Sequence, residues 1–420
     1  MVFKNYRHKL AALTALFITS FALAVVSFSL SPTNAEIVIK RLGNPLLSDG
    51  FDSRALNVWD LQAFDGKIYL GGGSTVDNVG PVNVWAYDPE TKEFIKEFTV
   101  KEEAIEHYRV YNDQLYIPAA DPTQDDLHKF YRREDNQWQQ YDSPVVKLAH
   151  VRDLIETNTK DILMVGNNRQ MKDSSSKGTI IAIPTQDGLK FQPSGVNNIP
   201  PQNVILADYN WFFSVFRYQD RIFSTNSLLR DAENYSGAIA EYDPILHQFS
   251  LNFDFRNDEF IPENIINGKK KQGLEVIYRP WNPVEFQDYL VYPVRSYSIS
   301  KSNYHAAYMN SIGCFIKSAM GVSPLALNLP NKALGEDVLV VNDQLYVLAN
   351  RKDQEDNFAV YVYKTDRLEQ KIEWQEVLQF SGANKARSFE YLDGTFYFGL
   401  GQDYGEAIAN SGDILSYTPQ

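Results

Sequence analysis

The sequence has almost no cysteine: Cys314 is the single one among 420 residues. One cysteine can form neither an intramolecular disulfide nor a multi-cysteine metal site. Positive charge is also scarce, because 40 Lys and Arg residues stand against 53 Asp and Glu residues and the formal net charge is −13. This balance excludes the basic surface that binds duplex nucleic acid and the polybasic segment that binds anionic membranes. Long runs of helical periodicity are absent, so helices are not expected to build the core.

The N-terminus has the order of an export signal. Basic residues at Lys4, Arg7 and Lys9 precede an uncharged apolar stretch over 10–30, and a polar segment over 31–35 ends in small residues. This order predicts a secretory signal peptide over residues 1–35. The alternative is an uncleaved anchor, because the apolar stretch is nearly long enough to span a bilayer. Either reading places residues 36–420 outside the cytoplasm, secreted or periplasmic, as one domain.

One short pattern recurs along the remainder of the chain: an apolar strand, a tight polar turn, and a second strand rich in Tyr or Phe. The seven copies lie at 64–70, 111–117, 158–164, 218–223, 286–291, 341–347 and 392–398. Asp-Gly and Asn-Asp pairs between apolar runs indicate hairpins, because these residues tolerate a positive φ. A spacing of roughly 45–70 residues predicts a four-stranded unit for each copy.

The first copy predicts strands A to D at 58–64, 67–71, 83–87 and 94–100. The seventh copy supplies strands A to C and then ends, without a strand D of its own. The segment 36–40 reads as a strand that belongs to no copy, and we expect it to supply the missing outer strand. Such an exchange joins the two ends of the chain and protects an open sheet edge. The sequence therefore predicts an all-β fold of seven four-stranded units in a closed ring.

With these repeats the chain resembles the seven-bladed β-propeller superfamily over nearly all of residues 36–420, with a kelch-like or sialidase-like architecture. No subfamily motif recurs. The run Gly71-Gly72-Gly73 has no regular successors of the kelch type, and Trp59-Asp60 lies on strand A where a WD-type motif would lie on strand C. The resemblance implies the fold and assigns no catalytic residue.

The resemblance also implies that the B–C and D–A connections share one face of the ring. The B–C connections are long, polar and variable, at 71–81, 120–127, 166–177, 225–236, 295–304, 349–357 and 401–411. Loops carried by a rigid scaffold are common places for binding. We therefore expect function on this face.

The starts of the seven A strands should surround the mouth of a central channel. Alignment of the copies places pairs there, and the candidate ligand-binding residues among them are Trp59, Asp60, His107, Arg152, Asp153, Trp281, Asp337 and Arg387. Aromatic faces with carboxylates suit sugars or peptides, and arginine forks suit a carboxylate-bearing ligand. The alternative is structural, with the Asp side chains bonded to a neighbouring blade and the tryptophans packed between blades.

Metal and cofactor signals are weak. The histidines have no zinc-ligand spacing, and neither acidic run, 121–126 or 353–357, has the pattern of an EF-hand. We predict no cofactor and no metal site, and the acidic runs leave calcium open. Cys314 lies among apolar residues and is expected to be a buried small hydrophobe.

Three functions fit these features. The first is a monomeric recognition module for a glycan, a peptide or a protein ligand outside the cytoplasm. The second is an enzyme on the same face, a glycosidase or polysaccharide lyase in which Arg152 or Arg387 holds the carboxylate of an acidic sugar. The third is a scaffold without a ligand. An enzyme should contain a channel carboxyl group with a perturbed pKa, whereas a recognition module should show an exposed aromatic patch.

Overall fold

The structure is a computed structural model, in which Ile39–Pro419 form one compact unit. It describes residues 37–50, 55–74, 79–123, 129–142, 150–167, 179–186, 188–193, 196–197, 212–226, 238–256, 275–300, 303–318, 324–354, 357–369, 371–401 and 409–419. The predicted export signal lies outside the described residues. Within the described part of the chain, no helix is long and apolar enough to cross a membrane.

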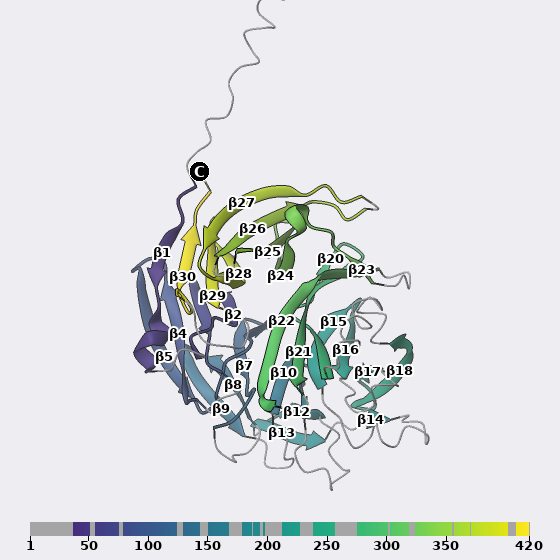
Figure 1. The fold of residues 1–420 in the computed structure, drawn as a ribbon. Coiled ribbons are helices and arrows are strands. Elements are labelled where there is room, and N and C mark those ends of the chain that lie inside the picture. The colour runs from purple at the N-terminus through teal and green to yellow at the C-terminus, as the bar shows by residue number, and fades with distance from the viewer. Residues whose placement is uncertain are drawn as a thin grey trace, which may run out of the picture. The chain divides into compact units, whose positions relative to one another are not determined.

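Seven antiparallel sheets form the blades of a ring, as predicted (Figure 1). Blade 1 contains β2 (Asp60–Phe64), β3 (Lys67–Gly71), β4 (Val82–Asp88) and β5 (Glu93–Val100). Blade 2 contains β6 (Arg109–Tyr111), β7 (Gln114–Pro118), β8 (Lys129–Glu134) and β9 (Gln137–Asp142). Blade 3 contains β10 (His150–Glu156), β11 (Ile162–Asn167), β12 (Thr179–Thr185) and β13 (Gly188–Pro193).

The remaining blades follow the same order from the inner strand A outward. Blade 4 contains β15 (Phe212–Tyr218), β16 (Arg221–Asn226), β17 (Ala238–Asp243) and β18 (Gln248–Arg256), with β14 (Val196–Asn197) parallel to β18. Blade 5 contains β19 (Glu275–Pro280), β20 (Val284–Phe286), β21 (Tyr289–Ser300), β22 (Asn303–Ser318) and β23 (Leu325–Ala326). Blade 6 contains β24 (Leu334–Val341), β25 (Gln344–Gln354), β26 (Asn357–Thr365) and β27 (Gln375–Gly382). Blade 7 contains β28 (Lys385–Leu392), β29 (Thr395–Gly401) and β30 (Ile414–Tyr417), and 3₁₀ turns lie at Pro45–Asp49 and Pro330–Lys332.

The A–B hairpins form where the sequence predicted them, because their turn residues adopt positive φ. Asn342 and Asp343 have φ of 50° and 58°, and Asp393 and Gly394 have φ of 47° and 81°. Asn, Asp and Gly occupy this region at the lowest cost. Each turn thereby fixes the register of its two strands, as in the pairing of Val341 with Gln344.

Aromatic side chains of the B strands fill the space between blades. Tyr69 on β3 is fully buried, and its ring lies 5.9 Å from that of Tyr108 and 6.3 Å from that of Trp138 in blade 2. Tilted and edge-to-face contacts of this kind add to the energy gained from burial alone. The Tyr and Phe residues that mark the repeat in the sequence therefore join neighbouring blades.

The ring closes through β1 (Lys40–Gly43), which pairs antiparallel with β30 and completes blade 7 (Figure 1). The Arg41 guanidinium donates Nε to Asp413 Oδ2 at 2.6 Å and Nη2 to Asp413 Oδ1 at 2.8 Å. Closure by an N-terminal strand is confirmed, but the strand begins at Lys40 and not at residue 36. Ile37 and Val38 precede it and are 45% and 63% exposed.

Blade 5 departs from the regular blade. Its inner strand is split: β20 pairs with β21 near the A–B turn, whereas β19 pairs with the far half of β21, from Pro280–Val294 to Glu275–Ile299. Residues 295–304, predicted as a loop, are therefore mostly strand, and so are residues 349–357 in blade 6. The split places Trp281 and Asn282 between β19 and β20, at the centre of the ring.

Candidate functional site

The inner strands carry the same irregularity at the same place in four blades. The pairing register shifts opposite Arg152 in β10, Phe213 in β15, Glu336 in β24 and Arg387 in β28. A β-bulge of this kind inserts one extra residue and redirects side chains. It explains why two adjacent residues, and not one, face the channel at the starts of these four inner strands.

In three of the pairs, Trp59-Asp60, Arg152-Asp153 and Glu336-Asp337, the second residue is an aspartate. Each of these aspartates accepts a hydrogen bond from the next blade. Asp60 Oδ2 accepts the Tyr108 N–H at 2.7 Å, Asp153 Oδ2 accepts the Val215 N–H at 3.1 Å, and Asp337 Oδ2 accepts the Phe389 N–H at 3.3 Å. All three carboxyl groups are buried. Each oxygen thus compensates a buried backbone donor of its neighbour, which is the structural role considered for these residues.

Serines make the same kind of junction in two other blades. Ser214 Oγ donates to the Pro280 carbonyl at 2.7 Å, and Ser388 Oγ donates to the Val58 carbonyl at 3.3 Å. The Ser388 bond crosses from blade 7 to blade 1, where the ring closes. Short polar side chains at this one position therefore link successive blades around the channel.

The first residues of the pairs form a layer of tryptophan and arginine across the channel. Trp59 and Trp281 are fully buried, with their ring centroids 6.5 Å apart. The Arg387 guanidinium lies 4.2 Å from the centre of the Trp59 ring, and the Arg295 guanidinium lies 3.7 Å from that of Trp281. Flat stacking of this kind suits an arginine withdrawn from water. Neither tryptophan forms the exposed aromatic patch expected of a recognition surface.

Arg279, at the end of β19, ties this layer together. Its Nη1 donates to Glu106 Oε2 at 2.7 Å, its Nη2 donates to the Arg152 carbonyl at 3.0 Å, and its Nε lies 3.4 Å from Ser214 Oγ. Burial alone would raise the pKa of Glu106, but Arg279 and Arg152 hold it below its usual range. One side chain of blade 5 thus contacts blades 2, 3 and 4.

His107 is also part of the layer. Its Nε2 accepts a hydrogen bond from Arg279 Nη2 at 2.7 Å, and its ring lies 4.0 Å from that of Trp281. Burial, with Arg109 and Arg279 nearby, lowers the pKa of His107 well below its usual value. The imidazole is therefore neutral and its Nε2 lone pair is occupied, which makes it a poor general base in this state.

Glu336 is the second carboxylate of the layer. It lies 3.6 Å from Arg295 Nη2 and 3.5 Å from Lys385 Nζ, and all three side chains are buried. Burial alone would raise the pKa of Glu336, but Lys385 and Arg295 lower it. The eight predicted residues do come together at the channel, but the most exposed of them, Arg152, has only 16% of its side chain exposed. They fill the channel at this level.

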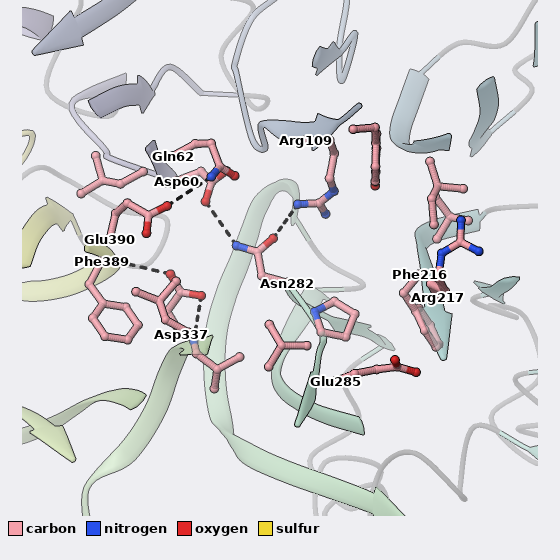
Figure 2. A pocket seen from close by; sticks show the side chains of 18 residues that line it. Asp60, Gln62, Arg109, Phe216, Arg217, Asn282, Glu285, Asp337, Phe389 and Glu390 are labelled. Carbon is pink, nitrogen blue, oxygen red and sulfur yellow. Dashed lines mark hydrogen bonds between the residues drawn. The ribbon is translucent and has the colours of Figure 1, made fainter. Parts of the chain in front are cut away.

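A pocket of about 390 Å³ is lined by residues that follow the starts of the inner strands toward the A–B turns. Figure 2 shows the side chains that line it. Its wall follows the inner strands from their starts toward those turns. The lining residues are Asp60, Leu61, Gln62, Arg109, Tyr111, Ile155, Val215, Phe216, Arg217, Asn282, Pro283, Val284, Glu285, Asp337, Val338, Leu339, Phe389 and Glu390. The volume is within the range of small-molecule sites, and the lining combines apolar residues with about as many polar or charged ones.

A hydrogen-bond chain crosses one end of the pocket. Asn282 Nδ2 donates to Asp60 Oδ1 at 3.2 Å, and Asn282 Oδ1 accepts from Arg109 Nη1 at 2.8 Å (Figure 2). The Arg109 guanidinium in turn makes a bidentate pair with Asp153, with distances of 3.0 and 3.2 Å. The arginine is thus neutralised within the wall, and the amide of Asn282 is held in one orientation.

Carboxyl groups with perturbed pKa values line the pocket. Burial raises the pKa of Asp60 to about 6 and that of Glu390 to about 7, and burial together with Asp60 raises the pKa of Asp337 well above its usual value. Glu390 accepts the N–H groups of Ala63 and Tyr391 at 2.9 and 2.8 Å. A perturbed carboxyl group in a pocket marks a candidate acid or base, although here each one also bonds to the backbone.

Polar side chains from blades 4 and 5 lie across the pocket from these carboxyl groups. Arg217 donates Nη2 to the Glu156 carbonyl at 3.1 Å, and Glu285 accepts the Gln219 N–H. Together with Gln62 and Phe216 they offer a guanidinium, a carboxylate, an amide and an aromatic ring. This set can orient a ligand that carries both hydroxyl or amide groups and an apolar face.

Sequence reasoning missed several residues of this region. Arg279 and Arg295 lie on β19 and β21, outside the A-strand starts, and their positions depend on the split strand of blade 5. Gln62, Arg217 and Glu390 lie two or more residues further along the inner strands. Alternate residues of a strand share a face, so the residues two positions after Asp60 and Ser388 should also face the channel. This rule would have found Gln62 and Glu390.

The remaining predicted features have mixed outcomes. Cys314 is buried, as expected. Parts of all seven B–C connections, including residues 124–126 and 355–356 of the acidic runs, lie outside the described residues. Among the described residues, no cluster of three or more His, Cys, Asp and Glu side chains is placed to hold a metal ion.

No known protein family matches the sequence, and no curated protein is similar to it. Among solved structures, the chain is similar to a PL25 ulvan lyase, with a TM-score of 0.49 and 9% identity over 86% of this chain and 92% of that one. It is also similar to the β-propeller domain of the trilobed protease of Pyrococcus furiosus, with a TM-score of 0.46 and 10% identity over 88% and 95% of the two chains. Similarity at this level concerns the strand arrangement and carries no information about what this chain binds.

Proposed function

We propose that this propeller is an exported recognition module that binds a glycan or a peptide in the channel pocket on the side of the A–B turns. The pocket itself carries the proposal, because it combines a volume of about 390 Å³ with apolar walls and oriented polar groups. The tryptophan–arginine layer fills the channel at the starts of the inner strands. A ligand of the pocket therefore approaches from the opposite end, past the tight A–B turns.

The polar groups fit a ligand that is rich in hydroxyl or amide groups. Asn282 is fixed between Asp60 and Arg109, and Gln62 donates to Glu390 Oε2 at 3.2 Å. Groups that are oriented before binding lose little entropy when a ligand arrives. The ring of Phe216 gives the same pocket an aromatic face, against which a sugar ring or an apolar side chain can pack.

A thermal-shift screen of the protein against neutral and acidic oligosaccharides and short peptides tests this proposal. A ligand at 100 times its Kd stabilises the folded state by about 2.7 kcal/mol, so a true ligand raises the melting temperature in a saturable way. Gln62→Ala and Arg217→Ala should each weaken binding about tenfold, and Arg351→Ala, at an exposed position, should leave it unchanged. A ligand whose affinity none of the pocket variants changes would contradict the site.

The direction of approach can be tested separately with that ligand. Asp343 lies in the A–B turn of blade 6, whereas Lys352 lies on β25 at the B–C end of the same blade, and both are exposed. A polyethylene glycol maleimide attached to Asp343→Cys should slow or block binding, and the same label on Lys352→Cys should not. Cys314 is buried and should not react. Equal effects of the two labels would argue against entry past the A–B turns.

An enzyme at the same pocket is the second candidate, and the raised pKa values of Asp60 and Glu390 favour it. A carboxyl group that keeps its proton near neutral pH can act as a general acid on a glycosidic oxygen. The screen separates the two functions when every stabilising oligosaccharide is also incubated with the protein and analysed for cleavage. Cleavage that is lost in Glu390→Gln supports the enzyme, whereas binding without cleavage supports the recognition module.

A further inference from the structure

Two arginines lie against Trp281, and their hydrogen bonding differs sharply. Arg279 donates to Glu106, to the Arg152 carbonyl and to His107. Arg295 donates only Nη2, to the Arg387 carbonyl at 3.0 Å, and its Nε and Nη1 have no acceptor among the described residues. The Arg295 side chain is only 1% exposed, so bulk water cannot supply the missing acceptors.

The tryptophans repeat this contrast. Trp59 Nε1 donates to the Gly73 carbonyl at 2.7 Å, whereas Trp281 Nε1 is fully buried and has no acceptor in the part of the chain that the structure describes. The Arg295 guanidinium lies 3.7 Å from the centre of the Trp281 ring. Three buried donor nitrogens without acceptors therefore belong to one stacked pair. Leaving buried donors unpaired costs about 1–3 kcal/mol each.

The charge around this pair is positive. The described cations of the layer are Arg152, Arg279, Arg295, Arg387 and Lys385, and the carboxylates within 4 Å of them are Glu106, Glu336 and Asp121. Burial, and then Arg387, lowers the pKa of Arg295 to about 9. Asp60 and Asp337 also act on Arg295, and both accept backbone N–H groups. Burial raises the pKa of Asp337 well above its usual value, whereas Asp60, with a pKa of about 6, is mostly ionised at neutral pH, so the five cations still outnumber the ionised carboxylates. A buried cluster with excess cationic charge is costly without a counter-ion.

We propose that Arg295 and Trp281 form a binding site for a small anion inside the tryptophan–arginine layer. Nε and Nη1 of Arg295 and Nε1 of Trp281 are its donors, and the anion accepts all of them without offering a hydrogen. A water molecule would accept the same bonds but would leave the excess charge. The burial of Arg295, Trp281 and Glu336 favours a compact occupant, a halide or the terminal oxygens of a carboxylate or sulfate. The anion is either free or part of a ligand.

Thermal unfolding of the full-length protein at constant ionic strength tests the site. Sodium bromide, sodium sulfate and sodium acetate replace, stepwise, the sodium salt of a bulky sulfonate buffer that is too large for a compact site. The melting temperature of the wild type should rise saturably with at least one of them. Trp281→Phe keeps the ring and removes one donor, so its half-saturating concentration should rise about tenfold. Arg295→Met should abolish the saturable rise, and Arg351→Met, at an exposed position, should retain it. A rise of equal size in Arg295→Met would overturn the proposal as a general salt effect.

Two further experiments identify the source of the anion. They also test the site if Arg295→Met does not fold. Crystals soaked in bromide should show anomalous scattering next to Arg295 and Trp281 Nε1, and a water molecule there instead would overturn the proposal. Glucuronate could raise the melting temperature of the wild type where glucose and every inorganic anion fail to do so. If this rise is lost in Trp281→Phe, the site belongs to the acidic group of a ligand. Failure of the anion site would leave the binding of neutral ligands in the channel pocket intact, so the two proposals can fail separately.

Discussion

At the scale of single residues, the channel pocket contains a buried carboxyl group, that of Glu390, for which no nearby cation offsets the effect of burial. This carboxyl group accepts N–H groups from Ala63 and Tyr391, and burial raises its pKa to about 7. In the unfolded chain the same carboxyl group has its ordinary pKa, near 4.5. The folded state therefore holds a proton that the unfolded state releases between about pH 4.5 and 7.

This difference fixes the sign of a pH effect. Stability contributed by the Glu390 proton is fully present below about pH 4.5 and is lost as the pH rises through about 7, a change of about 3 kcal/mol. Glu390→Gln cannot titrate, so its unfolding free energy should fall by about 3 kcal/mol less than that of the wild type between pH 4.5 and pH 8. Urea denaturation at the two pH values measures this. Glu93→Gln, at an exposed position, should show the same change in unfolding free energy between the two pH values as the wild type. If Glu390→Gln also shows the wild-type change, Glu390 is not the group that causes it.

At the scale of elements, β1 is short but has two functions. It covers the outer edge of β30, which would otherwise expose unpaired backbone groups, and it brings Arg41 to the buried carboxylate of Asp413. Blade 5 contains a second irregular element that makes contacts with other blades. The split between β19 and β20 places Arg279 and Trp281 at the centre of the ring. In both cases the departure from a regular blade carries the contacts that join distant blades.

Removal of residues 1–43 should therefore destabilise the whole ring. It opens the edge of β30 and leaves the buried carboxylate of Asp413 without the guanidinium of Arg41, whose own side chain is 60% exposed. The loss of such a half-exposed pair costs about 1 kcal/mol, and the backbone groups of β30 that lose their partners add to it. Differential scanning calorimetry should show one transition at a lower temperature. Removal of residues 1–36 leaves β1 in place and should melt like the full chain. Equal melting temperatures for the two truncated proteins would show that β1 does not close the ring.

At the scale of the whole molecule, the ring is held by a polar bond at the same position in successive blades. Asp153 joins blades 3 and 4 and also neutralises Arg109, whereas Ser388 joins blades 7 and 1. A closed ring has no free end from which to unfold. Weakening any junction should therefore lower the stability of all blades together, unlike in an open solenoid, where the stability of single repeats can differ.

Two substitutions at distant junctions test this cooperativity. Asp153→Asn removes the charge that neutralises Arg109, whose side chain is 15% exposed, and should cost about 3 kcal/mol. Ser388→Ala removes one buried hydrogen bond and should cost about 1 kcal/mol. The two sites share no partner, so the double variant should show the sum to within about 0.5 kcal/mol. Chemical denaturation followed by fluorescence and by circular dichroism should give coincident curves. Separate transitions for different probes would argue that the blades unfold independently.

The sequence alone determined the number of blades, the A–B hairpins and the closure by an N-terminal strand. These features are local: Asn, Asp and Gly favour positive φ in the turns, and alternation of apolar residues defines the strands that the turns connect. The missing outer strand of blade 7 could be deduced in the same way, because the seventh repeat has only three strands of its own and β1 supplies the fourth. Only the precise start of β1 was missed, since Ile37 and Val38 are as apolar as a strand requires but remain exposed.

The tertiary structure decided what the channel residues do. The sequence placed Trp59, Asp60 and Asp337 at a solvent-facing mouth. In the ring they are buried, because each of them contacts another blade. The pocket lies further along the same strands, toward the A–B turns. Arg279 and Arg295 reach the channel from a split strand that no local pattern indicates. Contacts between blades far apart in the chain set the burial and charge of these groups, and a single sequence holds no record of such contacts.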